Sequence, residues 1–117
     1  MDLQVSVRAG RECTVAWVSG ELDMDTRAKL QDMLRDVVDA GARQVVLDFT
    51  EVTFMDSSGL GLLVDGLKAL RDRGGRLCLA AVQESVHNVL VLSAVDQVVD
   101  IYETVQAAEE DMPPAAA

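Results

Sequence analysis

Apolar and polar residues alternate in several short stretches of the chain, and this two-residue period is typical of half-buried strands. Leu3, Val5 and Val7 alternate with polar neighbours in LQVSV. CTVAWVS at 13–19 predicts a second strand, and the short turn RAGRE at 8–12 indicates that the two strands form a hairpin. Apolar runs predict the later strands or extended segments, in RQVVLDF at 43–49, RLCLAAV at 76–82 and QVVDIY at 97–102.

Between these strands the apolar residues recur at helical spacing. GELDMDT at 20–26 predicts the start of the first helix, with Asp23 or Asp25 as its cap, and Gly41 predicts its end. TEVTFM at 50–55 is predicted to be an extended connection. Three further helices are predicted, from Ser58 to Gly74-Gly75, at 83–93 and at 103–111. This order of strands and helices predicts an α/β fold with a mainly parallel sheet that begins with an N-terminal hairpin.

Length and composition limit the kind of protein that this chain can be. A chain of 117 residues, 50% of them apolar, has the size of one domain, which we expect at 1–110 with a flexible tail at 111–117. The net charge of −10 repels nucleic acid and anionic lipid, so neither is an expected partner. Cys13 and Cys78 lie in apolar stretches and indicate free thiols. No secretory signal and no apolar run of roughly 18 residues is visible, and we expect a cytoplasmic protein without metal or other cofactor.

The stretch FMDSSGLGLLV at 54–64 places an acid, two hydroxyls and two glycines between a strand and a helix. One interpretation is an ordinary helix start, in which Asp56 or a serine caps free N–H groups and the glycines allow close packing. The other is a modification site, because Gly59 and Gly61 leave the helix end bare and a helix N-terminus tolerates a phosphate. An enzyme is disfavoured, because the one histidine, His87, lies in a different predicted helix and no nucleophile elbow or nucleotide-binding loop is present.

Three stretches of the sequence together resemble a known family. FMDSSGLGLL at 54–63, SGELD at 19–23 and RQVVLDFTEVTFMD at 43–56 resemble the STAS domain, and more narrowly the bacterial anti-sigma factor antagonists, also called anti-anti-sigma factors. The resemblance extends from Leu3 to about Ala108. It implies the α/β STAS fold, which is a mixed sheet of about four to five strands with helices mainly on one face.

The resemblance also implies a partner-switching mechanism. In that family an unphosphorylated antagonist binds an anti-sigma factor that is also a serine kinase, and the sigma factor is released. Phosphorylation of the antagonist by that kinase dissolves the complex, and a metal-dependent serine phosphatase restores the active form. The phosphoacceptor carries over to Ser57, with Ser58 as a lesser candidate. The chain is then a regulatory binding protein and a kinase substrate, and we expect a monomer because no surplus apolar stripe is visible.

The same resemblance implies a partner-binding surface on the two loops that carry the motifs. Glu21 is the candidate salt-bridge partner for a basic residue of the anti-sigma factor, and Met24 and Leu62 are candidate apolar contacts. Asp56 is implied to hold its loop and to mark the site for the kinase. The complete set of expected contact residues is Glu21, Asp23, Met24, Asp56, Ser57, Ser58, Gly59, Leu60 and Leu62.

Two other kinds of function also fit a chain of this type. A STAS subunit can act structurally in a transport or signalling assembly without any phosphorylation, although the intact Asp56-Ser57 pair disfavours that role. The bare helix end can instead sense a nucleotide or a lipid. Stabilisation by the added ligand in a melting assay would indicate the sensing role, because a ligand that binds the native state raises the melting temperature.

Overall fold

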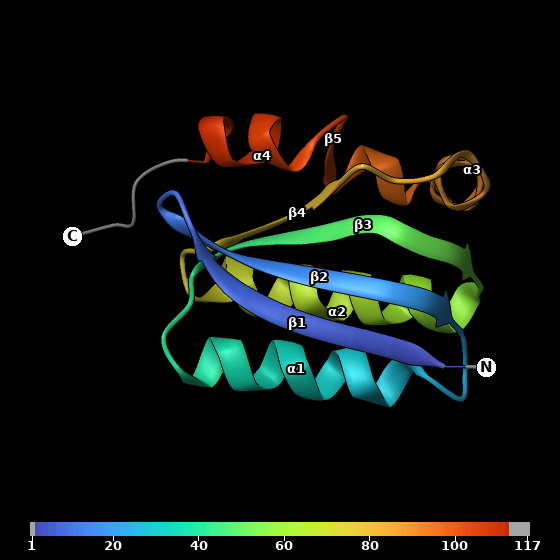
Figure 1. Cartoon of the computed structure of the whole chain (residues 1–117), viewed down its shortest axis with the longest axis horizontal. Helices are drawn as coiled ribbons and strands as arrows, with labels where there is room; N and C mark the ends of the chain where they lie inside the picture. Colours follow the sequence, from blue (N-terminus) through green and yellow to red (C-terminus); the bar gives the residue numbers. More distant parts are fainter. Residues whose placement is uncertain (1, 113–117) are drawn as a thin grey trace.

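The computed structural model describes residues 2–112, which form a five-stranded sheet packed against helices (Figure 1). The strands lie in the order β1-β2-β3-β4-β5; β1 and β2 are antiparallel, and all other neighbours are parallel. The predicted mixed α/β sheet is therefore confirmed. The elements are β1 (Leu3–Gly10), β2 (Cys13–Leu22), α1 (Arg27–Asp39), β3 (Gln44–Met55), α2 (Ser57–Asp72), β4 (Arg76–Ala80), α3 (Glu84–Leu92), the 3-10 helix η1 (Val95–Gln97), β5 (Asp100–Tyr102) and α4 (Val105–Asp111).

The sheet separates two apolar clusters. Val45 and Leu47 of β3 belong to the larger cluster and Val46 to the smaller one, because successive side chains of a strand point to opposite faces. Helices α1, α2 and α3 all contribute buried side chains to the larger cluster, whereas α4 contributes Ala108 to the smaller one. Figure 1 shows α1 and α2 below the sheet and α4 above it. The prediction of helices mainly on one face is confirmed.

The C-terminal helix α4 is fixed to the second face of the sheet. Its Glu109 carboxylate accepts a hydrogen bond from the backbone N–H of Arg11, at 3.0 Å, in the turn between β1 and β2. Met112, which follows the helix, is only 6% exposed and packs in the smaller cluster. The expected start of a flexible tail at 111 is therefore wrong, since the chain stays packed through Met112. The rest of that expected tail, 113–117, lies outside the described residues.

Three strands are longer than their apolar patterns predict. β1 continues to Gly10, so the hairpin turn is the two residues 11–12 rather than 8–12. β2 continues to Leu22, so part of the stretch predicted to open a helix belongs to a strand. The predicted connection at 50–55 is the second half of β3, which pairs with β2 through two register shifts. Pairing with a neighbouring strand extends these elements beyond the point where the apolar alternation stops.

Two helices end where glycines predicted their ends. At the end of α1, Gly41 has a φ of +107°, and its N–H donates to the carbonyl of Val38 at 3.0 Å. At the end of α2, Gly74 has a φ of +75°, and its N–H donates to the carbonyl of Arg71 at 3.0 Å. Only glycine adopts this left-handed backbone without a steric penalty, so both predicted helix ends are confirmed.

Candidate functional site

The parallel strands β2 and β3 end side by side, and their ends bring the two sequence motifs together. Leu22 and Met55 are neighbours in the last register position of this strand pair. Just beyond them, the backbone N–H of Asp56 donates to the carbonyl of Leu22 at 3.2 Å. This hydrogen bond fixes the start of α2 against the turn that follows β2. The GELD and DSSG stretches therefore form one continuous surface.

Asp56 is the N-cap of α2. Its extended backbone (φ −107°, ψ −170°) directs the carboxylate to the helix start, where it accepts a hydrogen bond from the N–H of Ser58 at 2.9 Å. Its backbone carbonyl accepts from the N–H groups of Gly59 and Leu60 at 3.1 and 3.3 Å. The helix begins at Ser57, one residue earlier than predicted. Asp56 thus holds the first turn by satisfying N–H groups that the helix itself leaves free.

The two serines differ in their exposure. Ser57 is the first residue of α2 and is exposed, whereas Ser58 is half-buried. Within residues 2–112, neither hydroxyl forms a hydrogen bond. The exposed His87 lies on α3 and lines a separate hollow with Tyr102, so it does not act as a base for either serine. The Ser57 side chain is therefore accessible at the surface of the domain.

The turn after β2 is built around Asp23. Its carboxylate accepts hydrogen bonds from the backbone N–H groups of Asp25 and Thr26, at 2.9 and 3.1 Å. The Thr26 hydroxyl donates to the carbonyl of Glu21 at 2.6 Å and closes the turn. Thr26 is the N-cap of α1, so the predicted cap at Asp23 or Asp25 is wrong. The Asp23 carboxylate stabilises the turn that precedes the helix, and it forms its hydrogen bonds within that turn.

The two glycines of the motif have different environments. A Cβ atom added to the buried Gly59 would lie 2.6 Å from Cγ of Met55 and 2.9 Å from Cγ of Leu22. Gly59 is therefore required for α2 to approach the strand ends. A Cβ added to Gly61 would meet no atom within 4 Å, and this residue is exposed. The helix-start interpretation, in which the glycines allow close packing, explains Gly59. Of the two glycines, only Gly61 leaves the helix surface bare, as the modification-site interpretation expects.

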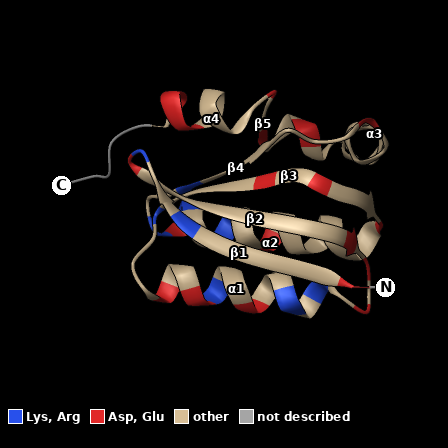
Figure 2. Ribbon diagram, viewed as in Figure 1, with Lys and Arg blue, Asp and Glu red and all other residues tan. Residues whose placement is uncertain are grey.

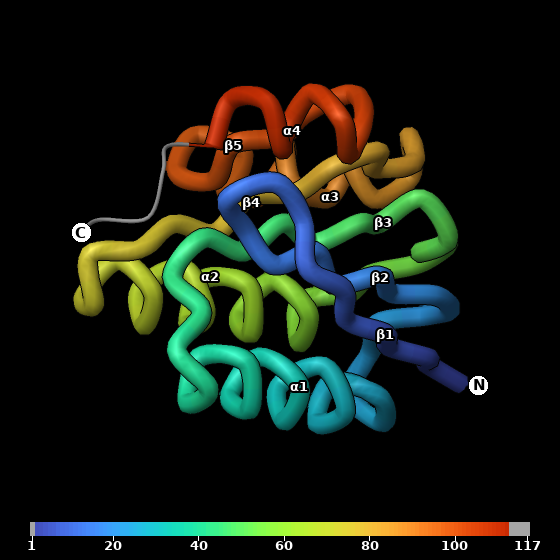
Figure 3. The backbone as a smooth tube through the Cα atoms, turned by 60° about the vertical axis from the view of Figure 1, so that its left-hand side comes forward, coloured from blue at the N-terminus to red at the C-terminus, as the bar shows by residue number. Residues whose placement is uncertain are grey.

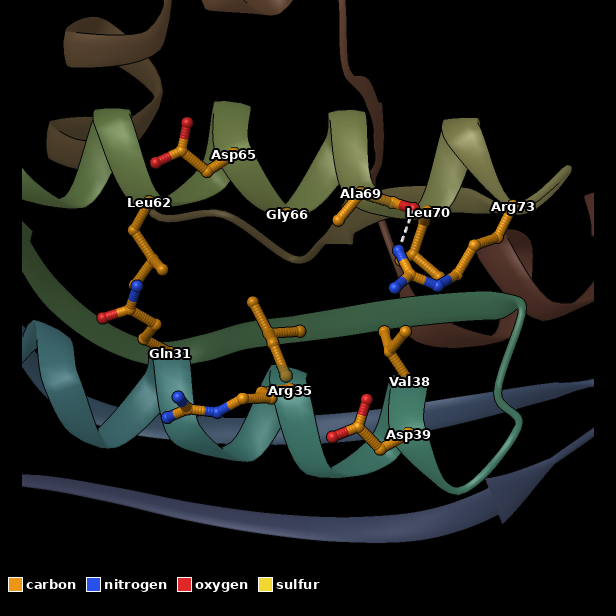
Figure 4. A pocket seen from close by; sticks show the side chains of 11 residues that line it. Gln31, Arg35, Val38, Asp39, Leu62, Asp65, Gly66, Ala69, Leu70 and Arg73 are labelled. Carbon is orange, nitrogen blue, oxygen red and sulfur yellow. Dashed lines mark hydrogen bonds between the residues drawn. The ribbon is translucent and has the colours of Figure 1, made fainter.

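The two leucines expected to contact the partner differ in their burial. Leu62 is only 6% exposed and points toward α1, into a groove of about 220 Å³ between α1 and α2 (Figure 4). Leu62 belongs to the core, and its expected role as a partner contact is not compatible with this burial. Leu60 is half-buried and packs against the same core. The helical spacing that placed Leu62 near the motif also turns its side chain inward.

Two other apolar side chains are exposed at this end of the sheet. Met24, in the turn after β2, is 76% exposed, as expected for a contact residue. Phe54 is 47% exposed and lies beside Glu21 in the register of β3 and β2. Phe54 is not among the predicted contact residues, because the sequence of 50–55 indicated a connection rather than a strand. Thr53 and Phe54 are both exposed between buried Val52 and Met55, so this part of β3 has no two-residue alternation that could have identified Phe54 from the sequence.

The surface around Ser57 is acidic. Figure 2 shows acidic segments at the end of β2 and in the turn that follows it. These residues, together with the acid at the start of α2, are Glu21, Asp23, Asp25 and Asp56. In the described part of the chain, no three His, Cys, Asp or Glu side chains are placed to hold a metal ion. Such a surface suits a partner with basic and apolar groups.

No helix among residues 2–112 combines the length and the apolar character needed to cross a membrane.

Comparison with known proteins identifies the family. The family model that matches the sequence is the STAS domain, over residues 4–108. The chain belongs to the STAS domain family. This confirms the resemblance found in the sequence. This STAS domain is 32% identical to the anti-sigma F factor antagonist of Paenibacillus polymyxa over 108 residues. The matched region covers 88% of this chain and 89% of that protein.

Solved structures of similar proteins agree with this assignment. A crystal structure of an anti-sigma factor antagonist from Mycobacterium paratuberculosis superposes with a TM-score of 0.86 at 25% identity, over 94% of this chain and 93% of that one. The anti-sigma factor antagonist SpoIIAA of Bacillus has been solved in unphosphorylated and phosphorylated forms. Those two structures superpose with TM-scores of 0.76 and 0.70 at 24% identity, over 92% of this chain and 95% and 97% of theirs. The SpoIIAA likeness shows the shared fold.

Proposed function

We propose that this STAS domain is an anti-sigma factor antagonist. In its unphosphorylated form it binds an anti-sigma factor with serine kinase activity and frees a sigma factor, and phosphorylation of Ser57 switches it off. One observation carries this proposal: Ser57 is exposed at the first residue of α2, on an acidic surface, in a chain whose relative is an anti-sigma factor antagonist. A metal-dependent serine phosphatase restores the active form, and the cycle takes place in the cytoplasm.

The contacts of the first turn of α2 explain how phosphorylation blocks binding without refolding the site. The N–H of Ser58 is already bonded to the Asp56 carboxylate at 2.9 Å, so a phosphate on Ser57 leaves this capping hydrogen bond in place. The phosphate adds roughly −1.5 to −2 charge next to that carboxylate. On a docked surface this charge must be desolvated, and a cost of about 3–4 kcal/mol weakens binding several-hundred-fold.

The same geometry suggests what the partner presents to this surface. Met24 and Phe54 offer exposed apolar area, and Glu21 lies beside Phe54 in the register. A basic side chain opposite Glu21 and an apolar pocket for Phe54 would complement these groups. Ser57 follows the end of β3 by two residues, directly after Asp56, which is bonded to Leu22 at the end of β2, so a phosphate there faces the same partner.

The test compares wild type with Ser57→Ala, Ser57→Asp and the neighbouring control Ser58→Ala as baits in lysate of the native host. We expect wild type, Ser57→Ala and Ser58→Ala to capture an anti-sigma factor of the ATPase type, and Ser57→Asp to capture none. After incubation with ATP, mass spectrometry should find phosphate on Ser57 of wild type and of Ser58→Ala. Equal capture of transport or scaffold subunits by all four baits, with Ser57 never phosphorylated, would instead indicate the structural STAS role.

A further inference from the structure

β1 forms one edge of the sheet, and its outer side is long and regular. It contains eight residues and pairs with β2 along its whole length without a register shift (Figures 1 and 3). The strand at the other edge, β5, has only three residues. Among residues 2–112, no element pairs with the outer side of β1. The chain therefore presents one long row of backbone groups at its surface.

The hydrogen bonds at the start of β1 show which of its backbone groups point outward. The N–H of Glu21 donates to the carbonyl of Asp2 at 3.4 Å, so Asp2 faces β2. Inward and outward positions alternate in an antiparallel ladder. Gln4, Ser6 and Arg8 therefore bond to β2, and the outward backbone groups belong to Leu3, Val5, Val7 and Ala9.

Local side chains occupy the two ends of this outer row but not its centre. The N–H of Leu3 donates to the carboxylate of Asp2 at 2.9 Å. The carbonyl of Ala9 accepts from the guanidinium of Arg8 at 3.4 Å. Both contacts confirm that these groups point away from β2. The N–H and C=O groups of Val5 and Val7 are left as the open centre of the edge.

Soluble proteins usually protect an edge of this kind with proline, lysine, a bulge or a very short strand. The stretch LQVSVRAG contains no proline and no lysine, and its one charged residue is Arg8. Val7 is 44% exposed on this edge. β1 therefore lacks the usual devices that prevent pairing with another chain.

We propose that β1 pairs antiparallel with β1 of a second copy of this chain, about a two-fold axis at Ser6. In this register Val5 faces Val7 of the second copy, so the open groups of one chain meet the open groups of the other. A shift of the axis to Val5 would direct the open groups of Val7 against Leu3, whose N–H is already bonded to Asp2. A shift to Val7 would direct those of Val5 against Ala9, whose C=O is already bonded to Arg8. The self-complementary register is what identifies a second copy as the partner.

Side chains and charges agree with this register. Val7, half-exposed in the single chain, packs against Val5 of the second copy. Arg8 faces Gln4, so no like charges lie opposite each other. The net charge of −10 on each chain opposes association, and salt screens that repulsion. Pairing should therefore strengthen as ionic strength rises, unlike association driven by surface ion pairs.

Amide hydrogen exchange, measured residue by residue by NMR, tests this pairing over a range of protein concentration. Mass action predicts that the Val5 and Val7 amides gain protection as concentration rises roughly a hundred-fold. The amides of Ser6 and Arg8 are matched internal controls, because they are protected by β2 at every concentration. Sedimentation equilibrium over the same range should show a monomer–dimer equilibrium that shifts toward dimer with added salt.

The variant Val7→Lys should weaken this dimer at least roughly tenfold, because it places a charge inside the paired edge. Val98→Lys is the matched control, since Val98 is 50% exposed and lies away from β1. A monomer at all concentrations with Val5 and Val7 amides unprotected would overturn the proposal. Protection of these amides that does not depend on concentration would also overturn it, because the same chain would then cover its own edge. Equal weakening of the dimer by Val7→Lys and Val98→Lys would overturn it as well. The sequence-based expectation of a monomer is decided by the same measurement.

Discussion

Two glycines of the same helix allow a sharp test of the site geometry. Gly59 and Gly61 lie two residues apart in α2, and alanine at either position improves helix propensity by about 1 kcal/mol. Gly61 is exposed, and an added Cβ would meet no atom within 4 Å. Gly61→Ala should therefore raise the free energy of unfolding by about 1 kcal/mol. This corresponds to a rise of roughly 4 °C in melting temperature.

The same substitution at Gly59 has the opposite expected sign. Its Cβ would lie 2.6 Å from Cγ of Met55 and 2.9 Å from Cγ of Leu22, whereas carbon atoms normally meet at about 3.5–4.0 Å. Both neighbours are fully packed, with exposures of 2% and 0%, so neither Cγ can move without disturbing the core. Overpacking of this kind costs about 1–3 kcal/mol. After the gain in propensity, Gly59→Ala should be less stable than wild type by up to about 2 kcal/mol.

Urea unfolding of wild type and the two variants measures this difference. Fluorescence of the single tryptophan, Trp17, reports unfolding, and circular dichroism provides a second probe. We expect the midpoint to rise for Gly61→Ala and to fall for Gly59→Ala, with an unchanged slope. If Gly59→Ala were stabilised as much as Gly61→Ala, the close packing of α2 on the strand ends would be wrong.

Variants at two other positions test the structure through pH and through capping. Burial raises the pKa of the Cys78 thiol to about 12 from its ordinary 9.0, so the unfolded thiol ionises first, and stability is lost as the pH rises above 9.0. This loss is about 1.4 kcal/mol per pH unit at most for one group, and wild type should show it in urea unfolding above that pH. Cys78→Ala, titrated in parallel, should show a smaller loss, because burial also raises the pKa values of Cys13 and Tyr102. Asp56→Ala should lower the free energy of unfolding by about 1 kcal/mol, whereas Asp56→Asn should keep most of it because asparagine is an equally good N-cap. An equal loss in both Asp56 variants would show that charge, rather than the capping hydrogen bond, stabilises the helix start.

The fold was largely predictable because its main signals are local. Glycine alone adopts the left-handed backbone at Gly41 and Gly74 at low cost, so both helix ends could be identified from single residues. Strand lengths were less predictable, because β2 and β3 extend by pairing with each other after their apolar runs end. The burial of Met112 depends on the second face of the sheet, and no local pattern reports that contact.

The site was predictable in position but not in the direction of each side chain. Asp56 and Ser57 lie where the motif placed them, since a cap and its helix start are adjacent in sequence. Leu62 was misjudged because closeness to the motif in sequence says nothing of which helix face is buried. Phe54 was overlooked because a long strand with register shifts does not show a clean alternation. Both errors arise from tertiary contacts that decide which of two neighbouring side chains faces solvent.

The arrangement at the strand ends separates the groups that hold the fold from those that can meet a partner. The Asp56 carboxylate and Gly59 are engaged with the backbone and the core, and each would damage the fold if it were altered. Ser57, Met24 and Phe54 project outward and hold nothing in place. A charge added at Ser57 therefore changes the surface while the capping hydrogen bond remains. A switch that acts by blocking a docked surface requires this independence, because a refolding switch would have to break the contacts that the motif's own acid and glycine make.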